Sequence, residues 1–404
     1  MIGLGSMIGA GVFAAFGPAA RAAGSGLLLG LVLAALVAYC NATSSAQLAA
    51  LYPESGGTYV YGRKRLGAFW GYLAGWCFVV GKLASCAAMA MTFGGYASPT
   101  LARPCAVVVV IALTALNYTG IQKTLALTKV LLGGVLLALT AVVACVWLGG
   151  EADPARLASF AGVTAWGVAR SAGFLFFAFA GYARLATLGE EVIEPARTIP
   201  RAIPLALSIT LVIYAVVGVS VLAGVDARDL AASAAPLATA VEAGRFASLS
   251  SVVRLGATLA SLGVLLSLIV GVSRTAFAMA VGGDLPSFFA AVHPRFRVPH
   301  RAEVAVGVVV VAVVMVADVR GAIGFSSFAV LLYYAIANAA AWTLRAHERR
   351  WPRALAALGL VGCIGLAAAL PTSSVGGGVV VLGLGALAYA LRYSRHGDGA
   401  PPSG

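Results

Sequence analysis

Long apolar runs are the feature that most constrains this chain. Runs of about 20 apolar residues recur from Gly3 to Leu391, and each is long enough to cross a ~30 Å hydrocarbon core as a helix. Of the 404 residues, 61% are hydrophobic and 10% are charged, whereas soluble domains carry about 25% charged residues. The runs are continuous and rich in Gly and Ala, unlike the alternating segments of a membrane β-barrel. The sequence therefore predicts an all-α integral membrane protein.

Glycine, proline and clusters of charge divide these runs into twelve predicted transmembrane helices, which form a single transmembrane domain over 1–404. The predicted spans are 2–22, 26–51, 68–98, 104–118, 124–149, 167–189, 202–224, 252–282, 303–318, 321–344, 354–371 and 375–391. The loops after even-numbered spans, with the C-terminal tail, hold about twice as many Lys and Arg as the opposite loops. This bias predicts a multi-pass protein of the cytoplasmic (plasma) membrane with both termini in the cytoplasm.

Several other classes of protein are disfavoured. The net charge of +13 does not indicate nucleic acid binding, because the Lys and Arg residues lie in loops between apolar runs. The six cysteines lie within or at the edges of spans, without CxxC or Cys/His spacing, so packing is favoured over metal or disulfide roles. The four histidines lie at or beyond the predicted cytoplasmic loops, and no nucleophile–base pair is recognisable. An enzyme, a metal site and a cofactor are therefore not expected.

Two spans, five spans apart, carry glycine where a helix could break. The first contains Gly3, Gly5, Gly9 and Gly11, and the sixth contains Gly181 among aromatic residues in mid-membrane. Transporters with two inverted five-helix repeats place their substrate site between such interrupted helices. The pattern predicts repeats at 1–149 and 167–344, with two peripheral helices at 354–391. The alternative is that these glycines only let helices pack closely.

The chemistry at two such breaks suits a zwitterion. N–H groups freed near Gly9, Ala10 and Gly11, at the start of a half-helix, would donate to a carboxylate. Carbonyl groups freed around Met7 and, in the sixth span, around Phe179, Ala180 and Gly181 would accept from an ammonium group. Two side chains complete this predicted substrate site: Ser6 as a hydroxyl and Phe177 as an aromatic lid.

Charged residues near the spans supply further candidates. Lys82 is near the middle of the third span, where an ammonium is costly unless it is paired or faces a wet cavity. It is a candidate for proton coupling, or for a fixed cation in place of a sodium ion. Snorkelling or a static interhelical bond is the alternative. Four residues form a polar cluster that is either an inner gate or a solvated loop: Glu190, Glu191, Arg197 and Arg201.

Four stretches together resemble the amino acid-polyamine-organocation (APC) superfamily, nearest the cationic amino acid transporter branch and its bacterial relatives. GSMIGAGVF with Gly17 and Pro18 is similar to the first-helix signature of amino acid permeases. YPESGGTYVYGRKRLG is similar to the loop after the second helix. FFAFAGYARLATLGEEVIEPARTIPRAI is similar to the sixth helix and its loop, and SRTAFAMAVGGDLPSFFAAVHPRFRVPHRAE to the segment after the eighth helix.

The resemblance implies a LeuT-type fold with alternating-access transport of amino acids. It places carboxylate contacts at Ala10 and Gly11, ammonium contacts at Met7 and Ala180, and an aromatic gate at Phe177. The partners it implies are an amino acid substrate, protons and the lipid bilayer.

The chain departs from the family pattern in two ways. Some sodium-independent relatives carry a lysine in the fifth helix. Here Val135 takes that position, and Lys129 lies about two turns earlier. Lys82 therefore becomes the candidate for the role of that lysine. Few residues precede the first break, so half of the first helix is expected to be missing, through a late start or a truncation.

The leading hypothesis is a sodium-independent, proton-coupled amino acid importer. A facilitative importer, an exchanger of amino acids or polyamines, and a non-transporting sensor are the alternatives. The scarcity of acidic residues in the spans favours neutral substrates.

Overall fold

The computed structural model describes residues 7–54, 56–120, 125–150, 152–160, 162–182 and 195–396, and these residues form helices without any β-strand. A helix corresponds to each of the twelve predicted spans, in the predicted order. These helices are α2 (Gly11–Ala23), α3 (Leu27–Leu51), α5 (Ala68–Ala97), α6 (Ala102–Tyr118), α7 (Leu125–Leu148), α8 (Ala165–Phe179), α10 (Pro195–Gly224), α13 (Ser250–Val281), α14 (His300–Val316), α15 (Val319–Trp342), α16 (Arg353–Ala369) and α17 (Thr372–His396). The prediction of an all-helical membrane protein is confirmed.

Within these ranges, seven helical segments are long and apolar enough to cross a membrane, and the first of them joins α2 to α3. Helices α6, α8 and α16 are apolar but shorter. The start of α10 differs from the predicted boundary, because this helix begins at Pro195 rather than at 202 and continues through Pro200 and Pro204. Proline is tolerated inside transmembrane helices because neighbouring groups satisfy the freed carbonyls, so these prolines did not mark the boundary.

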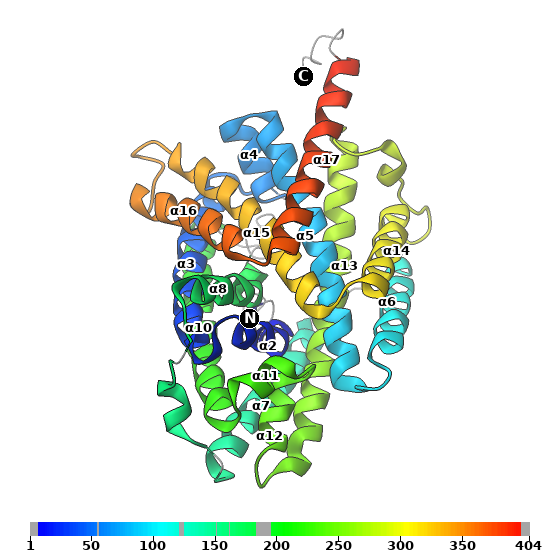
Figure 1. Cartoon of the computed structure of the whole chain (residues 1–404). Helices are drawn as coiled ribbons and strands as arrows, with labels where there is room; N and C mark the ends of the chain where they lie inside the picture. Colours follow the sequence, from blue (N-terminus) through cyan, green and yellow to red (C-terminus); the bar gives the residue numbers. More distant parts are fainter. Residues whose placement is uncertain are drawn as a thin grey trace.

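Short helices lie at the two ends of the bundle (Figure 1). Helix α4 (Thr58–Leu66) is at one end, and α11 (Ala227–Ala232) and α12 (Pro236–Glu242) are at the other. We call these the α4 end and the α12 end. Among the residues that the structure describes, four 3₁₀ turns lie in connections: η1 (Gly24–Gly26), η2 (Pro154–Ala158), η5 (Ala247–Leu249) and η6 (Ser287–Ala290). A fifth, η3 (Ala180–Tyr182), directly follows α8.

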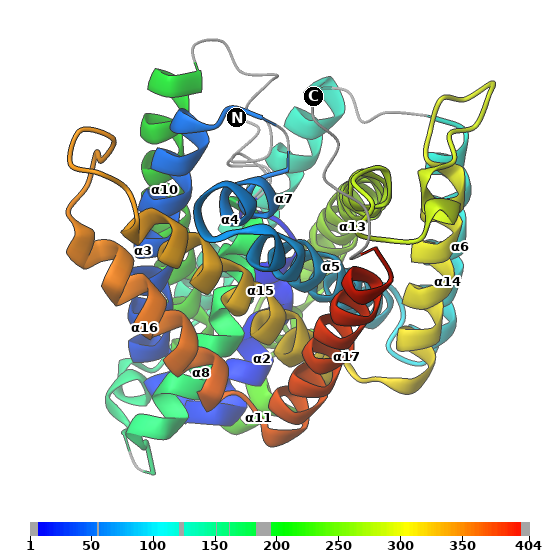
Figure 2. The same cartoon turned by 90° about the horizontal axis from the view of Figure 1, so that it is seen from above.

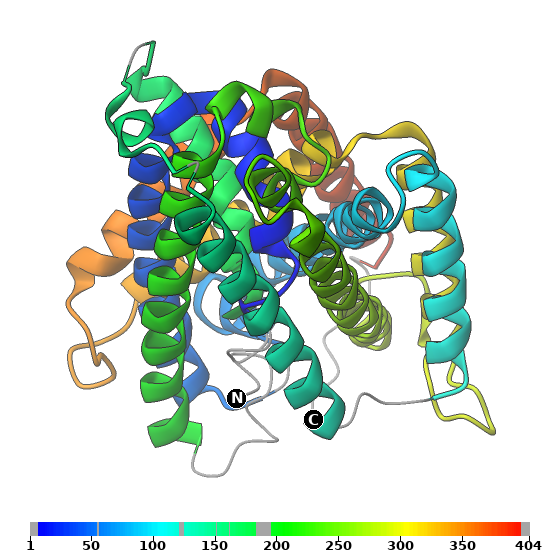
Figure 3. The ribbon, with the colours of Figure 1, turned by 90° about the horizontal axis from the view of Figure 1, so that it is seen from below.

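Helices α5 and α15 form the centre of the bundle, and α5 packs against both α13 and α15. Small residues permit these contacts, because an ideal Cβ on Gly81 of α5 would lie 2.9 Å from Cβ of Ala329 of α15. Figures 2 and 3 show α6 and α14 side by side at one edge. Helix α17 is also peripheral, and leucine and valine side chains on its outer face are exposed where lipid would cover them.

Candidate functional site

The start of α2 touches the end of α8 inside the bundle. Residues Ile8, Gly9 and Ala10 precede α2 without forming a regular helix, and α2 begins at Gly11 with no side-chain cap. An ideal Cβ on Gly11 would lie 2.8 Å from Cα of Ala178, closer than real Cβ contacts allow. Only glycine therefore permits this approach between the two helix ends.

Tyr214 of α10 joins the same two helix ends. Its buried hydroxyl lies 2.5 Å from the Met7 carbonyl oxygen and 3.2 Å from that of Ala178, so one O–H donor is shared between them. The Tyr214 ring packs on Phe179, with centroids 5.2 Å apart. The N–H of Gly9 also donates to the Met7 carbonyl, at 2.9 Å. Both lone pairs of that carbonyl are thus engaged within the protein.

The predicted substrate site is brought together around this contact. The set of buried residues at the two helix ends comprises Met7, Gly9, Ala10, Phe179 and Ala180, whereas Gly11, Phe177 and Gly181 are partly buried. Ser6 lies outside the described residues. Sequence reasoning did not include Tyr214, although a lone tyrosine in an apolar span is a signal, since a buried hydroxyl needs a partner.

A small cavity of about 20 Å³ lies beside the start of α2, between α7 and α13. Ile8 and Gly9 line it together with Val135, the position at which some relatives carry a lysine. An ideal Cβ on Gly9 would lie 2.6 Å from Cγ2 of Val264 of α13, so this glycine also permits a close approach. Lys129 of α7 is exposed.

Lys82 is buried in the middle of α5, with 7% of its surface exposed. It has no hydrogen-bond or ion-pair partner among the residues that the structure describes. Gly75, two turns earlier on the same face, approaches Met279 of α13. Tyr96 lies fourteen residues later, about 21 Å further along the helix. Lys82 therefore lies about midway along α5, between the α4 end and Tyr96.

Helix α4 ties three other segments together at its end of the bundle. Arg63 forms an ion pair with Asp284, which follows α13, and the Tyr59 hydroxyl donates to the same carboxylate at 2.7 Å. Arg65 pairs with Glu348, in the loop after α15, at 2.7 Å. The N–H of Thr58 donates to the Tyr333 hydroxyl of α15 at 3.1 Å. We call these contacts the α4 latch.

Two pKa shifts keep the α4 latch in its bonded form. Burial, together with the hydrogen bond to Asp284, raises the pKa of Tyr59, so the phenol stays protonated as a donor. The backbone N–H of Arg345, followed by the Arg65 side chain, lowers the pKa of Glu348, so this carboxylate stays ionised at neutral pH.

The α4 latch involves none of the four residues predicted for the inner gate. Glu190 and Glu191 lie outside the described residues, and the side chain of Arg197 is not described. Arg201 is exposed on α10. The latch partners were missed because they are far apart in the chain: Arg63 and Asp284 are separated by 221 positions.

We predict that Asp284→Ala loosens the α4 end, because it leaves both Tyr59 and Arg63 without their acceptor. A buried hydrogen bond to a charged group is worth about 1.5–3 kcal/mol, enough to raise the population of an open form about tenfold or more. Alkylation of the buried Cys86, four residues after Lys82, by N-ethylmaleimide should become several times faster, as measured by mass spectrometry. Asp229→Ala at the α12 end is the matched control. Equal alkylation rates in both variants would contradict a latch at the α4 end.

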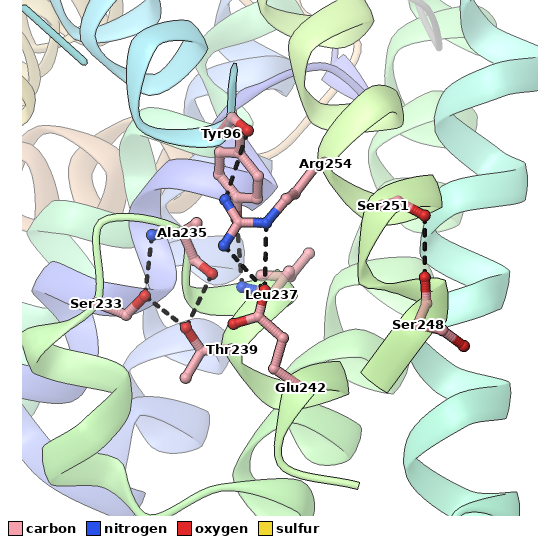
Figure 4. Close-up of polar contacts among 9 residues, drawn as sticks. All are labelled: Tyr96, Ser233, Ala235, Leu237, Thr239, Glu242, Ser248, Ser251 and Arg254. Carbon is pink, nitrogen blue, oxygen red and sulfur yellow. Dashed lines mark hydrogen bonds and ion pairs between the residues drawn. The ribbon is translucent and has the colours of Figure 1, made fainter. Parts of the chain in front are cut away.

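The α12 end is closed by a second polar cluster (Figure 4). Arg254 of α13 forms an ion pair with Glu242 at 2.9 Å. The Tyr96 hydroxyl accepts from the N–H of Leu237 at 3.2 Å and donates to the carbonyl of Phe13 in α2 at 3.0 Å. Tyr96 thus fastens α12 over α2. The α4 latch and this cluster thus hold helices together at the two ends of the bundle, and the contact between α2 and α8 is buried between them.

Comparison with known proteins gives the family. A family model described as amino acid permease matches residues 1–389. The chain belongs to the amino acid permease family. An uncharacterized transporter of Mycobacterium tuberculosis is 62% identical over 392 residues, covering 97% of this chain and 89% of the relative. The recognition of the APC superfamily from the sequence is confirmed, and the permease is a transporter of amino acids rather than an enzyme.

The names of two more distant relatives state the substrate of each. The branched-chain amino acid permease of Bacillus subtilis is 27% identical, with 74% of this chain and 69% of the relative covered. Cationic amino acid transporter 3 of Arabidopsis thaliana is 29% identical, with 82% of this chain and 59% of the relative covered. These names apply to those proteins.

Proposed function

We propose that this permease is a secondary active transporter that moves amino acids across the cytoplasmic membrane by alternating access. The observation that carries the proposal is the contact of the α2 start with the α8 end, buried between two closed ends. Alternating access requires a central site that is open to one side at a time. The α4 end is the cytoplasmic end in this proposal, because α4 itself carries Arg63, Lys64 and Arg65. Both chain termini are then cytoplasmic.

The α-amino acid lies between the two helix ends. Its carboxylate accepts from the N–H groups of Ala10 and Gly11, where the positive end of the α2 dipole supports it. Its ammonium group donates to the carbonyl groups of Phe179 and Ala180, while the Tyr214 hydroxyl keeps its bonds to Met7 and Ala178 and so holds the two helix ends in position. Phe177, which is partly buried two residues before the end of α8, covers the ligand.

The inverted-repeat division 1–149 and 167–344 accounts for the positions of the two helix ends. Helix α2 opens the first unit and α8 opens the second, and their interruptions meet. Helices α16 and α17, from 354 to 391, pack outside this pair of units in the proposed arrangement. The proposed arrangement relates the two units by inverted topology, as in other transporters with inverted repeats.

Coupling is assigned to protons at Lys82, without sodium. Lys82 is a buried amine without a partner among the described residues, whereas Val135 at the cavity beside Gly9 offers no ionisable group. A lysine that alternates between buried and wet surroundings can bind and release a proton during the transport cycle.

Lys82→Ala is therefore expected to lose gradient-driven uptake. In proteoliposomes with an inward proton gradient, accumulation of radiolabelled amino acid should fall at least about tenfold, because no group remains to carry the proton. Exchange of internal for external amino acid, which needs no net proton movement, should persist. Lys129→Ala, at the exposed lysine of α7, is the control. Accumulation by Lys82→Ala at the wild-type level would remove Lys82 from the coupling path, and dependence on sodium would contradict the sodium-independent mechanism.

A further inference from the structure

A pocket of about 300 Å³ lies at the α12 end, between the end of α2 and the short helix α11. Figure 1 shows α11 beside α2, and the two helices pack against each other. Two arginines line the pocket, Arg21 in the last turn of α2 and Arg228 on α11, and both are exposed. The other lining residues are alanines and a glycine. The pocket therefore has room for a small ligand, and guanidinium groups are its charged lining.

Arg320, in the first turn of α15, adds a third positive charge. Helix α15 touches α2, and Arg21 is near enough to Arg320 to interact with it electrostatically. The Nε atom of Arg320 is shielded from solvent and has no hydrogen-bond partner among the residues that the structure describes. Two guanidinium groups repel each other at short range, so an anion that accepts hydrogen bonds beside them would relieve the repulsion.

Three other arginines at the α12 end bond within the protein. Arg156 and Arg103 donate to backbone carbonyl groups at 3.0 and 3.2 Å, and Arg254 forms the ion pair described above. In the described part of the chain, by contrast, no hydrogen bond or ion pair holds Arg21 or Arg228. Positive residues are the scarcer on the predicted outer side, yet arginines from three separate elements meet at this one pocket.

Carboxylates near the pocket offset only part of this charge. Asp318 acts on Arg320, but its Oδ1 atom also accepts from the N–H of Gly321 as the cap of α15. Asp226 and Asp229, at the start of α11, are exposed and do not line the pocket. The charges that line the pocket are therefore positive. All of them belong to arginine, whose planar fork of donors matches the oxygens of a phosphate group.

We propose that this pocket binds an anionic phosphate group, with the guanidinium groups of Arg21 and Arg228 on its oxygens and Arg320 supporting them. The phosphate belongs either to the headgroup of an anionic phospholipid or to inorganic phosphate in solution. The end of α2 and the start of α15 mark where these spans leave the hydrocarbon core, which is the depth of lipid headgroups. A phosphate bound there links α2 to α11 and so stabilises their contact.

Binding to the purified, full-length permease tests the proposal. Native mass spectrometry compares phosphatidylglycerol, an anionic lipid, with phosphatidylcholine, which has no net charge, and isothermal titration calorimetry measures inorganic phosphate. The double variant Arg21→Gln/Arg228→Gln removes both lining charges. Arg245→Gln is its control, at an exposed arginine of the same end that does not line the pocket.

A second variant keeps both arginines. Ala232→Glu adds a carboxylate at an exposed lining position, and Ala232→Gln adds the same bulk without the charge. Circular dichroism and thermal unfolding establish that each variant is folded. If the double variant does not fold, the comparison of Ala232→Glu with Ala232→Gln tests the same charge requirement.

The wild type and Arg245→Gln are expected to bind phosphate at this site. Preference for phosphatidylglycerol over phosphatidylcholine would assign the site to a lipid headgroup, and binding of inorganic phosphate alone would assign it to the free anion. In either case the affinity should fall at least about tenfold in the double variant, because charge-assisted hydrogen bonds are lost. Ala232→Glu should bind more weakly than Ala232→Gln, since the added carboxylate repels the anion.

Two results would overturn the proposal. One is that the wild type neither binds inorganic phosphate nor prefers phosphatidylglycerol to phosphatidylcholine. The other is that the folded double variant, or Ala232→Glu relative to Ala232→Gln, retains the full affinity. Neither result depends on transport, so the phosphate site and the proposed amino acid transport stand or fall separately.

Discussion

Replacing Gly11 by leucine is expected to abolish amino acid uptake by the purified permease. The new Cβ would lie 2.8 Å from Cα of Ala178, a backbone atom that cannot turn away as a flexible side chain can. The start of α2 must then separate from the end of α8. Overpacking of this kind costs about 1–3 kcal/mol of folding stability and shifts the backbone at the proposed substrate site.

The measurement is uptake in proteoliposomes, together with the thermal unfolding temperature of the same protein. Gly133→Leu is the matched control, because an ideal Cβ on Gly133 of α7 has nothing within 4 Å. The control should transport normally. Normal uptake by Gly11→Leu would show that the close contact between α2 and α8 is not needed for transport.

Tyr214→Phe is expected to weaken substrate affinity about tenfold or more, with a smaller loss of stability. The change removes the donor shared by the Met7 and Ala178 carbonyl groups, and leaves buried acceptors at a cost of about 1–3 kcal/mol. The ring remains in contact with Phe179, so packing is retained. The start of α2 would then be held less firmly against α8.

Equilibrium binding of the transported amino acid measures this effect directly. Tyr39→Phe, at a partly exposed tyrosine of α3, controls for the loss of a hydroxyl elsewhere in the protein. An unchanged dissociation constant in Tyr214→Phe would mean that the hydroxyl does not position the substrate-binding backbone.

Apolar run length predicted the helices well because crossing a membrane imposes a minimum length on each span. The break points were also near those observed: α2 begins at Gly11 and α8 ends at Phe179, where glycine and crowded aromatics disfavour a continuous helix. The short helix α4 was not predicted, because Arg63, Lys64 and Arg65 give it the composition of a loop. Its helical form depends on contacts with distant segments.

Pairings between distant residues could not be predicted from one sequence. Thr58 and Tyr333 are 275 positions apart, and neither residue type predicts that the other is its partner. Tyr214 likewise finds its acceptors only because α10 packs beside both helix ends. Lys82 and Tyr214, each the one residue of its type in its helix, were visible in the sequence, but their surroundings depend on the tertiary arrangement.

The α4 latch has a consequence for leakage. Its contacts with the segment after α13, the loop after α15 and α15 itself all start from one helix of nine residues. A single rigid element carrying several bonds releases them together, so partly open forms are sparsely populated. A carrier that opens in one concerted step rarely forms a continuous water-filled path across the membrane. In the proposed proton-coupled mechanism, concerted release by α4 is expected to limit dissipation of the proton gradient while the permease is idle.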